Sequence, residues 1–499
     1  MGKRRYAFSM DALILAAGRG SRLAPITDSI PKALLRVAGR ALIERQIEAF
    51  ITFGVERVVI VTGYMSLKIK NFLEQKNYPV EIVLVDNSEW ELTNNMYSFA
   101  LGAKYLQNSA FVINGDICFE NDFLNSFVQN EVSSVGIFEN QYLAESMKVI
   151  ADGNLARSIS KIVPKDASKG ISADIFYFTY SDIKTLIREA NNYFTKSGKK
   201  DWFEKIVSCC TEDNKIALHI TPLGRSNWVE IDNEQDLSSA DKLFFNIEEF
   251  LDHDNFFFDL DGTLILDHQA TSCSSLLINR LSKLGKSIFI VTNKTSLTIP
   301  EISQLCTVNF FPIPIENIFT PIRALERFLG QNGFRSPLIL GEESFKRHLN
   351  NFEDFSKQRI YDIVVISDDL TMTAEKLSTA ANLINLGVPY ILTHLDIIRP
   401  TPEGIFPDAG LWGIALHRMT GVEAISILGK PDISILEDSP TENSILIGDR
   451  YDSDILLGKR AGMSTALILT GVTTRKDYED QRMVVDYLLQ DLCLSWSDD

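Results

Sequence analysis

The feature that most constrains the fold is a rhythm of short apolar runs and amphipathic stretches that begins twice along the chain. In the first half, apolar runs with the length of buried strands lie at residues 12–17, 57–62, 80–85 and 110–115. Between them, residues 40–54 and 64–75 carry apolar side chains at spacings of three and four, which is typical of amphipathic helices. Strand–helix alternation of this kind predicts a largely parallel sheet with helices on both faces.

The rhythm restarts at residues 256–260 and continues to the end of the chain. Later strand-like runs lie at residues 286–292, 336–341, 361–367, 388–393, 444–449 and 465–471. Residues 236–255, between the two systems, predict one helix and a short acidic hinge. Because 499 residues exceed what one hydrophobic core usually supports, we expect separate α/β domains with a boundary near residue 250.

Composition narrows the classes of partner. A net charge of −17 argues against a protein that binds duplex nucleic acid, which needs a basic face. The six cysteines show neither a CxxC motif nor metal-ligand spacing, and this predicts free thiols in a reducing compartment. No apolar stretch approaches the roughly 20 residues of a membrane helix. We therefore expect a cytoplasmic protein without nucleic-acid or membrane partners; a homo-oligomer stays open.

A glycine-rich loop follows the first predicted strand, in the stretch "LAAGRGSRLAPITDSIPKAL" of residues 15–34. Gly18 and Gly20 allow the backbone to approach a ligand closely, and backbone N–H groups in such a loop bind anions. Arg22 and Lys32 add positive charge where a leaving pyrophosphate would develop negative charge. A glycine-rich turn alone is often only a tight turn, but the proline, threonine and lysine that follow at fixed spacing favour phosphate binding.

This pattern resembles the signature of the sugar-phosphate nucleotidyltransferase superfamily, LAAGxGxRxxPxTxxxPKxL. The resemblance implies a Rossmann-like domain, over residues 1–245, in which an acceptor phosphate attacks the α-phosphate of a nucleoside triphosphate. It assigns Arg22 and Lys32 to phosphate neutralisation. The residues that it assigns to nucleotide binding are Ala16, Ala17, Gly18, Gly20 and Asn94.

Two aspartates extend the resemblance to a metal. Asp116 ends the strand in "FVINGDICF" and Asp232 lies in "NWVEIDNEQDL". Alone, either aspartate is more often a helix N-cap, but at these family positions they imply a Mg²⁺ site, since Mg²⁺ prefers oxygen ligands. We expect one or two Mg²⁺ ions per site.

The stretch "VDNSEWELTNNMYSFALG" of residues 85–102 resembles cytidylyltransferases for phosphocholine and related small phospho- or phosphono-alcohols. This implies CTP as the nucleotide and places Asn95 near the acceptor. The aromatic candidates for the pocket are Trp90, Tyr97, Trp202 and Trp228. Such rings suit a quaternary ammonium group and suit ordinary core packing equally well. The acceptor therefore stays open between glycerol phosphate, phosphocholine and an aminoalkyl phosphonate.

The second system begins with "FFFDLDGTLI", in which a strand carries Asp259 to its carboxyl end and Asp261 follows two residues later. One carboxylate can attack a phosphate while the other protonates the leaving oxygen and then activates water. The DxDGT pattern resembles the haloacid dehalogenase superfamily. Its remaining elements follow in order and contribute Thr292, Lys430, Asp449 and Asp454. The resemblance implies a phosphatase with an aspartyl-phosphate intermediate and a Mg²⁺ site made by Asp259, Asp449, Asp454 and the backbone carbonyl of Asp261.

The long interval between Thr292 and Lys430 resembles the class IIA branch of that superfamily, which carries an inserted α/β cap. We expect the cap at residues 332–420, between Rossmannoid core segments at residues 246–331 and 421–499. In this branch the cap selects the substrate, so His394, Asp396 and Arg399 are candidate substrate contacts, and surface or capping roles suit each of them at least as well. Asn293, outside the cap, is a further candidate substrate contact. Lys294 stands where relatives commonly have asparagine.

The two blocks together predict a bifunctional enzyme, a cytidylyltransferase joined to a Mg²⁺-dependent phosphatase of small phosphoesters. A phosphatase that acted on the acceptor would destroy it, so we expect the phosphatase to act on another phosphorylated intermediate. Two alternatives remain: a sugar-1-phosphate nucleotidyltransferase with a phosphatase of the same pathway, or with a regulatory C-terminal domain that does not catalyse.

Overall fold

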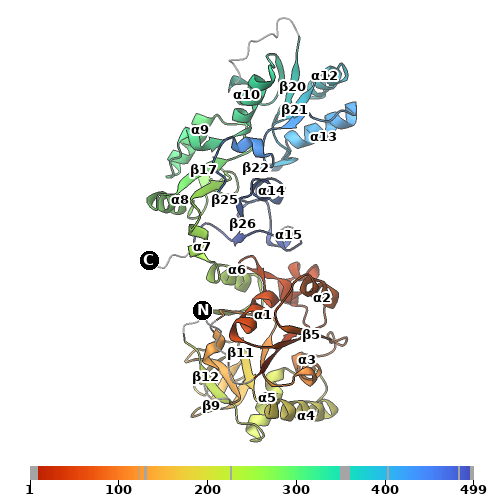
Figure 1. Cartoon of the computed structure of the whole chain (residues 1–499), viewed down its shortest axis with the longest axis vertical. Helices are drawn as coiled ribbons and strands as arrows, with labels where there is room; N and C mark the ends of the chain where they lie inside the picture. The colour runs from red at the N-terminus through yellow and green to blue at the C-terminus, as the bar shows by residue number, and fades with distance from the viewer. Residues whose placement is uncertain are drawn as a thin grey trace. The chain divides into compact units, whose positions relative to one another are not determined.

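The computed structural model describes residues 9–121, 123–127, 132–224, 227–348, 360–401, 404–480 and 484–494. The chain divides into two compact units, Met1–Phe244 and Phe245–Asp499. Both are α/β, as the strand–helix rhythm predicts (Figure 1).

The N-terminal unit is built on one nine-stranded sheet. In spatial order the strands are β5 (Glu81–Asp86), β4 (Arg57–Thr62), β1 (Met10–Ala16), β6 (Ser109–Asn114), β11 (Gly170–Phe178), β8 (Ser134–Glu139), β12 (His219–Pro222), β10 (Leu155–Ser160) and β9 (Lys148–Asp152). The first four run parallel, and β11 pairs antiparallel with β6. The carboxyl ends of β1 and β6 therefore meet at one edge, which is where ligands bind in open α/β sheets.

Alternation along β1 divides its side chains between two buried layers. Ile14 packs in the layer that contains α1 (Leu42–Phe53) and α2 (Ser66–Glu74). Leu13 and Leu15 pack in the opposite layer. That layer contains α3 (Asn95–Gly102), α4 (Tyr180–Ser197) and α5 (Phe203–Glu212). The sheet is thus covered on both faces, as its continuous apolar strands require.

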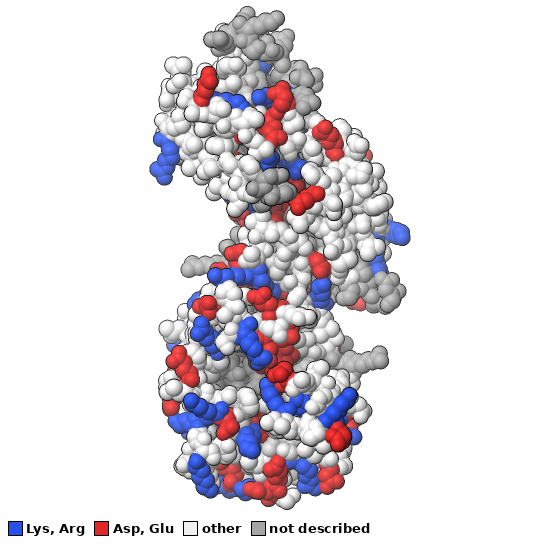
Figure 2. Space-filling view, turned by 180° about the vertical axis from the view of Figure 1, so that it is seen from behind, with Lys and Arg blue, Asp and Glu red and all other residues white. Residues whose placement is uncertain are grey.

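Short elements complete this unit. They are the ribbon β2 (Arg36–Val37) with β3 (Arg40–Ala41), and the ribbon β7 (Ile117–Phe119) with β13 (Trp228–Glu230). On the face of the unit drawn in Figure 2, Lys and Arg side chains are interspersed with Asp and Glu.

The stretch between the two systems differs from the prediction of one helix and a hinge. It contains two helices, α6 (Glu234–Leu243) and α7 (Ile247–Leu251). Leu237 and Ala240 of α6 pack in the N-terminal unit, whereas Phe250 of α7 packs in the C-terminal core. Because α6 packs in one unit and α7 in the other, the helical conformation is interrupted between them.

The C-terminal unit contains a fully parallel six-stranded sheet. In spatial order its strands are β18 (Ile318–Phe319), β17 (Ser287–Val291), β14 (Asn255–Phe258), β25 (Ser444–Gly448), β26 (Ser464–Ile468) and β27 (Tyr487–Leu489). Besides α7, the described helices around this sheet include α8 (Ser274–Lys283), α9 (Ile299–Val308), α14 (Leu456–Arg460) and α15 (Arg475–Asp480). A small ribbon, β15 (Ile265–Leu266) with β16 (Gln269–Ala270), follows the central strand β14.

A second parallel sheet forms the cap. It consists of β19 (Pro337–Leu340), β20 (Ile363–Ile366), β21 (Tyr390–Leu392) and β24 (Ser426–Ile427). The other elements of the cap are α10 (Pro321–Asn332), α11 (Glu343–His348), α12 (Ala374–Asn385), α13 (Ala409–Thr420) and the hairpin β22 (Ile398–Thr401) with β23 (Gly404–Pro407). α10 begins before, and β24 follows, the expected cap residues 332–420, and both contact this sheet. The apolar face of α10, with Leu325 and Leu329, packs on Val365 of the cap sheet, and β24 is a strand of that sheet.

The cysteines depart from the prediction that all six are free thiols. Cys273 and Cys493 form a disulfide across 220 residues of sequence, while Cys118, Cys209, Cys210 and Cys306 are free. No local motif signals this pair, because only the fold brings α8 beside the C-terminal segment. No helix in the described ranges combines the length and apolar character needed to cross a bilayer.

Candidate active sites

The glycine-rich loop of the N-terminal unit lies where β1 ends and borders a cavity of about 240 Å³. Gly20 adopts a left-handed φ of 70°, and a Cβ atom there would lie 2.9 Å from Cδ of Lys32. The Thr27 hydroxyl donates a hydrogen bond to the Gly20 carbonyl (2.9 Å). The loop thus needs glycine at residue 20 so that the lysine side chain can cross it into the cavity.

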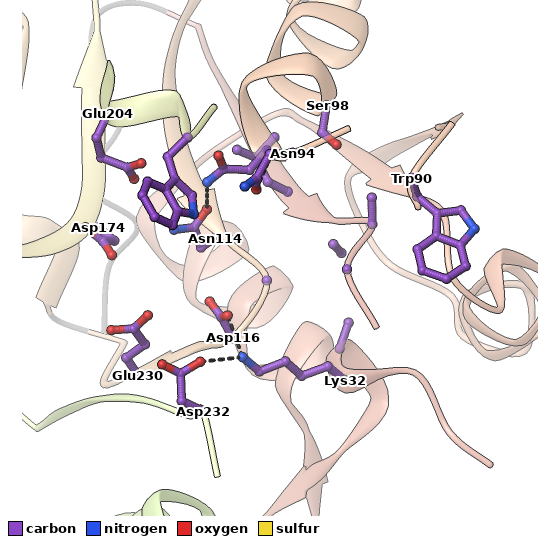
Figure 3. Close-up of a pocket in the computed structure, with 18 of the residues that line it drawn as sticks. Lys32, Trp90, Asn94, Ser98, Asn114, Asp116, Asp174, Glu204, Glu230 and Asp232 are labelled. Carbon is purple, nitrogen blue, oxygen red and sulfur yellow. Dashed lines mark hydrogen bonds and ion pairs between the residues drawn. The ribbon is translucent and has the colours of Figure 1, made fainter. Parts of the chain in front are cut away.

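Lys32 joins the two predicted metal-binding aspartates (Figure 3). Its Nζ lies 2.6 Å from Oδ2 of Asp116 and 3.2 Å from Oδ1 of Asp232. Arg22 approaches the other oxygen of Asp232 at 3.0 Å. Burial on its own would lower the pKa of Lys32, but the two carboxylates outweigh it and raise that pKa. The ammonium therefore stays charged where phosphates would bind.

Glu230 completes a group of three carboxylates with Asp116 and Asp232. One oxygen from each lies within 4.8 Å of the others. Burial, followed by the charges of Asp174, Asp116 and Asp232, raises the pKa of Glu230 to about 9. Asp116 also has a buried oxygen, Oδ1, without a hydrogen-bond partner among the described residues. An all-oxygen group with an unsatisfied buried oxygen fits a hard divalent cation such as Mg²⁺.

The start of α3 forms another wall of this cavity. Asn94 caps the helix, with its side chain accepting from the Asn95 N–H (2.8 Å). The Asn95 amide donates to Oδ1 of Asn114 (3.2 Å) and accepts from the Phe203 N–H (2.7 Å). Trp90 lines the cavity and packs edge-on against Tyr64. These contacts fix the side chains around the loop before any ligand binds.

Two further carboxyl groups, Asp174 and Glu204, line the same cavity (Figure 3). Their residues are only 6% and 2% exposed. Burial, and then the charge of Glu204, raises the pKa of Asp174 well above its usual value. Burial is also the main cause that raises the pKa of Glu204, to about 7.

In the C-terminal unit, Asp259 directly follows the central strand β14 and lines a cavity of about 620 Å³. Nζ of Lys430 lies 2.5 Å from Oδ1 of Asp259 and 2.6 Å from Oδ1 of Asp454. Burial opposes the charge of Lys430, but the two carboxylates outweigh this and raise its pKa. Burial raises the pKa of Asp259 as well. Lys430 therefore stays protonated, and its positive charge neutralises the buried carboxylate of Asp259.

Asp449 forms a second carboxylate group with Asp259 and Asp454, again with ligand atoms within 4.8 Å of one another. Its Oδ1 is buried and has no hydrogen-bond partner in the part of the chain that the structure describes. Gly262, with a φ of 86°, makes room for it, since a Cβ at residue 262 would lie 2.7 Å from Oδ2 of Asp449. This group also fits a hard divalent cation.

Asp261 and Thr292 lie beside this centre. Nζ of Lys294 contacts both carboxylate oxygens of Asp261, at 2.9 and 3.2 Å. The Thr292 hydroxyl accepts from the Lys294 N–H (3.1 Å). Asp261 is half exposed, so its side chain can reach a substrate that enters the cavity.

The cap contributes the far wall of the same cavity. His394 Nε2 lies 2.8 Å from Oδ1 of Asp408, and Arg399 pairs with Asp368 and, at 3.3 Å, with Glu342. Asp396 accepts from the Asn293 amide (3.0 Å). On the cap side of the cavity, the acidic side chains are therefore paired with basic ones, and charges of both signs are present.

Comparison with known proteins gives a separate match for each half. A model of the MobA-like NTP transferase domain matches residues 12–160, and models of haloacid dehalogenase-like hydrolases match residues 256–353 and 407–493. The 5'-nucleotidase YutF of Bacillus subtilis is 30% identical over 230 residues, which are 44% of this chain and 89% of that protein.

The chain belongs to the haloacid dehalogenase-like hydrolases in its C-terminal unit, and its N-terminal unit contains a match to the MobA-like NTP transferase domain.

Two other relatives bear on the two halves. A 2-aminoethylphosphonate cytidylyltransferase of Lancefieldella rimae is 28% identical over 48% of this chain and 95% of its own length. A dihydroxyacetone phosphatase of Corynebacterium glutamicum is 28% identical over 43% of this chain and 80% of its own length. The predicted pairing of a nucleotidyltransferase with a phosphatase is thus confirmed as a pairing of families.

The structure brings most predicted site residues together. Those that line the transferase cavity are Ala16, Ala17, Gly18, Arg22, Lys32, Trp90, Asn94, Asn95, Asp116, Trp202 and Asp232. Those that line the hydrolase cavity are Asp259, Asp261, Thr292, Asn293, His394, Asp396, Arg399, Lys430 and Asp449. Asp454 lies beneath, fully buried, and contacts Lys430.

Two predicted aromatic residues, Tyr97 and Trp228, do not line the transferase cavity. The Tyr97 hydroxyl donates to Glu89 (2.9 Å), and Lys199 stacks on its ring. The Trp228 indole donates to the Ala173 carbonyl (2.9 Å) and packs on Phe138. Both side chains make contacts within the protein, and their binding of substrate stays a prediction.

Sequence reasoning missed Asp174, Glu204 and Glu230. Glu230 stands two residues before Asp232, and alternation along a strand would have placed the two carboxylates on one face. Asp174 interrupts the apolar run "GISADIFYF", which is itself a signal, because an isolated acid in a buried strand needs a reason.

Proposed function

We propose that the N-terminal unit is a CTP-dependent cytidylyltransferase that activates a small phospho-alcohol or phosphonate. The observation that carries this proposal is Lys32, which crosses Gly20 to join Asp116 and Asp232 beside the glycine-rich loop. CTP and a small acceptor are supported by the relative named for 2-aminoethylphosphonate.

In this reaction an acceptor oxygen forms a bond to the α-phosphorus, and the bond from that phosphorus to the bridging oxygen breaks. Pyrophosphate leaves with its negative charge. Lys32 and Arg22 neutralise the phosphates, and Asn94 and Trp90 border the nucleotide. Asp116, Asp232 and Glu230 would hold Mg²⁺, which when bound neutralises phosphate charge and orients the reacting oxygens. Because no group of the chain bonds to phosphorus, positioning and charge carry the rate.

We propose that the C-terminal unit is a phosphatase in which Asp259 is the nucleophile. Its carboxylate oxygen bonds to phosphorus while Asp261 gives a proton to the leaving alcohol oxygen. Asp261 then takes a proton from water, which attacks the aspartyl phosphate and releases phosphate. Lys430 holds Asp259 in place, and Thr292 would bind a phosphoryl oxygen. Asp259, Asp449, Asp454 and the Asp261 carbonyl would hold Mg²⁺, which screens the charge of the phosphate from that of the carboxylates.

We further propose that the phosphatase acts on a phosphoester other than the acceptor, since hydrolysis of the acceptor would defeat the transferase. Both reactions are assigned to the cytoplasm, where nucleoside triphosphates are made. A small, uncharged leaving group is supported by the relative named for dihydroxyacetone phosphate and by the balanced charges of the cap wall.

The full chain tests both proposals. Pyrophosphate release is measured with each nucleoside triphosphate and a panel of phosphocholine, 2-aminoethylphosphonate, glycerol 3-phosphate and glucose 1-phosphate. We expect CTP with one of the first three, whereas glucose 1-phosphate as the best acceptor would favour a sugar nucleotidyltransferase. Phosphate release is measured on the same panel and on dihydroxyacetone phosphate, and fastest hydrolysis of the transferase's own acceptor would contradict separate substrates.

A further inference from the structure

The side chain of Asn293 forms hydrogen bonds to both polar backbone groups of Lys430. The Lys430 N–H donates to Oδ1 of Asn293 (2.8 Å), and Nδ2 of Asn293 donates to the Lys430 carbonyl (3.3 Å). Both residues are buried, although they are 137 residues apart in sequence. The ammonium of the same lysine contacts Asp259. Fixing the backbone of Lys430 therefore limits where that ammonium can lie, because a side chain supported by such hydrogen bonds keeps one geometry.

The side chain of Asn293 also reaches the cap. Its Nδ2 donates to Oδ2 of Asp396 (3.0 Å), a residue that lies between β21 and the hairpin of β22 and β23. The other oxygen of Asp396, Oδ1, lies 3.5 Å from Nη1 of Arg450, which follows Asp449 in the core. Both oxygens of this cap carboxylate therefore contact side chains of the core.

Arg450 and Asp454 lead back from the cap to Lys430. The Arg450 N–H donates to Oδ2 of Asp454 (3.0 Å), and Nζ of Lys430 lies 2.6 Å from Oδ1 of the same aspartate. A closed series of contacts, which we call the Lys430 network, thus joins Lys430, Asn293, Asp396, Arg450 and Asp454. Asp396 comes from the cap, and the other four residues come from the core. Because hydrogen bonds in a buried network strengthen one another, a change at Asp396 should reach Lys430.

Asn293 and Asp396 also line the hydrolase cavity, where a substrate would bind. The polar groups of Asn293 are already engaged, however. An asparagine amide has two N–H donors, and those of Asn293 are directed to Asp396 and to the Lys430 carbonyl. Its oxygen accepts from the Lys430 N–H. A substrate that bound these groups would have to displace contacts within the protein, and this favours a supporting role.

We propose that Asn293 and Asp396 are positioning residues of the phosphatase, which hold Lys430 against Asp259 instead of contacting the leaving group. This inference rests on the proposed phosphatase function. The cap then contributes to phosphoryl transfer itself, because its Asp396 completes the Lys430 network. Neither positioning residue forms a bond to phosphorus. Lys430 acts on the nucleophile and the phosphoryl group, which all substrates share, so the loss of either positioning residue should affect all substrates alike.

A panel of leaving groups separates positioning from substrate contact. Phosphate release by the full chain and by its Asn293→Ala variant is measured on 4-nitrophenyl phosphate, dihydroxyacetone phosphate and glycerol 3-phosphate. We expect the substitution to lower kcat about 10- to 100-fold for every substrate, by factors that agree within about threefold, and to change KM much less. Circular dichroism at the assay temperature checks that the variant is folded. An unchanged kcat, a change confined to KM, or factors that differ by about tenfold or more among the substrates would overturn the inference.

Two substitutions of Asp396 test the contribution of the cap, and they also decide the inference if Asn293→Ala does not fold. Asp396→Asn keeps an oxygen that can accept from the Asn293 amide, whereas Asp396→Ala removes it. We expect Asp396→Ala to lower kcat about tenfold or more for every substrate and Asp396→Asn to lower it less. Asn317→Ala is the matched control, because Asn317 donates to a backbone carbonyl of the same unit, that of Ile288 (2.9 Å), and is not in the cavity lining. Equal losses in the two Asp396 variants, or a similar loss in the control, would contradict the Lys430 network.

Thermal unfolding tests the Lys430 network without turnover. If the wild type releases phosphate from none of these substrates, the proposed phosphatase fails, whereas the coupling between Asn293 and Lys430 still decides the inference. The full chain is compared, with a chelator present, with Asn293→Ala, Lys430→Met and the double variant. The sum of the two single shifts in Tm should exceed the shift of the double variant by about 2 °C or more, because Lys430 stabilises less once Asn293 no longer holds it. Additive shifts would reject the inference.

Discussion

Single residues decide the geometry of both centres, and Gly20 is the sharpest case in the transferase. Residue 20 has a left-handed φ of 70°, and a methyl group there would lie 2.9 Å from Cδ of Lys32. The backbone strain alone costs about 1–2 kcal/mol, and relief requires the lysine or the loop to move.

Gly20→Ala should therefore lower kcat/KM for pyrophosphate release by about tenfold or more while phosphatase activity stays at the wild-type level. Gly153→Ala is the matched control, because Gly153 has a similar left-handed φ of 58°, is not in the lining of the cavity, and a Cβ there meets nothing within 4 Å. Equal effects of the two substitutions would show that the crossing of Lys32 over the loop does not matter.

Lys430 has the corresponding importance in the phosphatase, since it neutralises both Asp259 and Asp454 inside the protein. Lys430→Met removes this charge and leaves three clustered carboxyl groups. We expect loss of phosphatase activity and a C-terminal unit destabilised by about 3–5 kcal/mol without metal. Mg²⁺ should restore part of that stability, because a ligand that binds only the folded state stabilises it.

Thermal unfolding with Mg²⁺ and with a chelator measures this effect. Lys294→Met serves as control, because it breaks a pair in which Asp261 is half exposed and should cost only about 0–1 kcal/mol. If Mg²⁺ leaves the unfolding temperature of Lys430→Met unchanged, the three carboxyl groups are not a metal site.

At the scale of elements, the cap hairpin and α13 are joined to the active-site wall by His394 and Asp408. Asp408 also caps α13 by accepting from the Ala409 N–H (2.7 Å). Burial on its own would lower the pKa of His394, but the charge and hydrogen bond of Asp408 outweigh it and raise that pKa. Burial would raise the pKa of Asp408, and His394 reverses this and lowers it.

The pair therefore stabilises the cap most between about pH 4 and pH 6.5, the ordinary pKa values of the two groups. The contribution of His394 is lost as the pH rises through its raised pKa, and that of Asp408 as the pH falls through its lowered pKa. Asp408→Asn keeps the helix cap and removes the charge. In urea unfolding, the variant should lose about 1–3 kcal/mol at pH 6 and less at pH 9. An equal loss at both values would contradict a charged pair.

Sequence patterns predicted the elements well where local apolar spacing decides them. Strands β1, β4 and β6 of the first unit and β14, β20 and β25 of the second coincide with predicted apolar runs, because a strand buried on both faces carries apolar side chains at nearly every position. The break between α6 and α7 was not predicted, because its cause is the packing of Phe250 in the other unit, a contact that has no local signature.

The site was predictable where a motif fixes both residue type and spacing, and unpredictable where long-range packing selects one residue among similar ones. Arg22, Lys32 and Asp259 follow their motifs to the cavities. Trp90 and Trp202 line the cavity, whereas Tyr97 and Trp228 are not in its lining, and no local pattern in the sequence separates the two pairs. The Cys273–Cys493 disulfide was not predicted either, because only long-range packing brings together two cysteines that are 220 residues apart.

For the whole molecule, each unit contains a complete cavity with its own carboxylate group and its own lysine. The described residues that line each cavity all belong to that cavity's own unit. Two chemistries on one chain can therefore be removed one at a time.

The most direct measurement is a crossed pair of substitutions in the full chain, Asp116→Asn and Asp259→Asn, each assayed for CTP-dependent pyrophosphate release and for phosphate release. We expect Asp116→Asn to lower only pyrophosphate release and Asp259→Asn to lower only phosphate release, each by about 10³-fold or more. Loss of both activities in either variant, with its folding intact, or survival of the matching activity, would contradict two independent active sites.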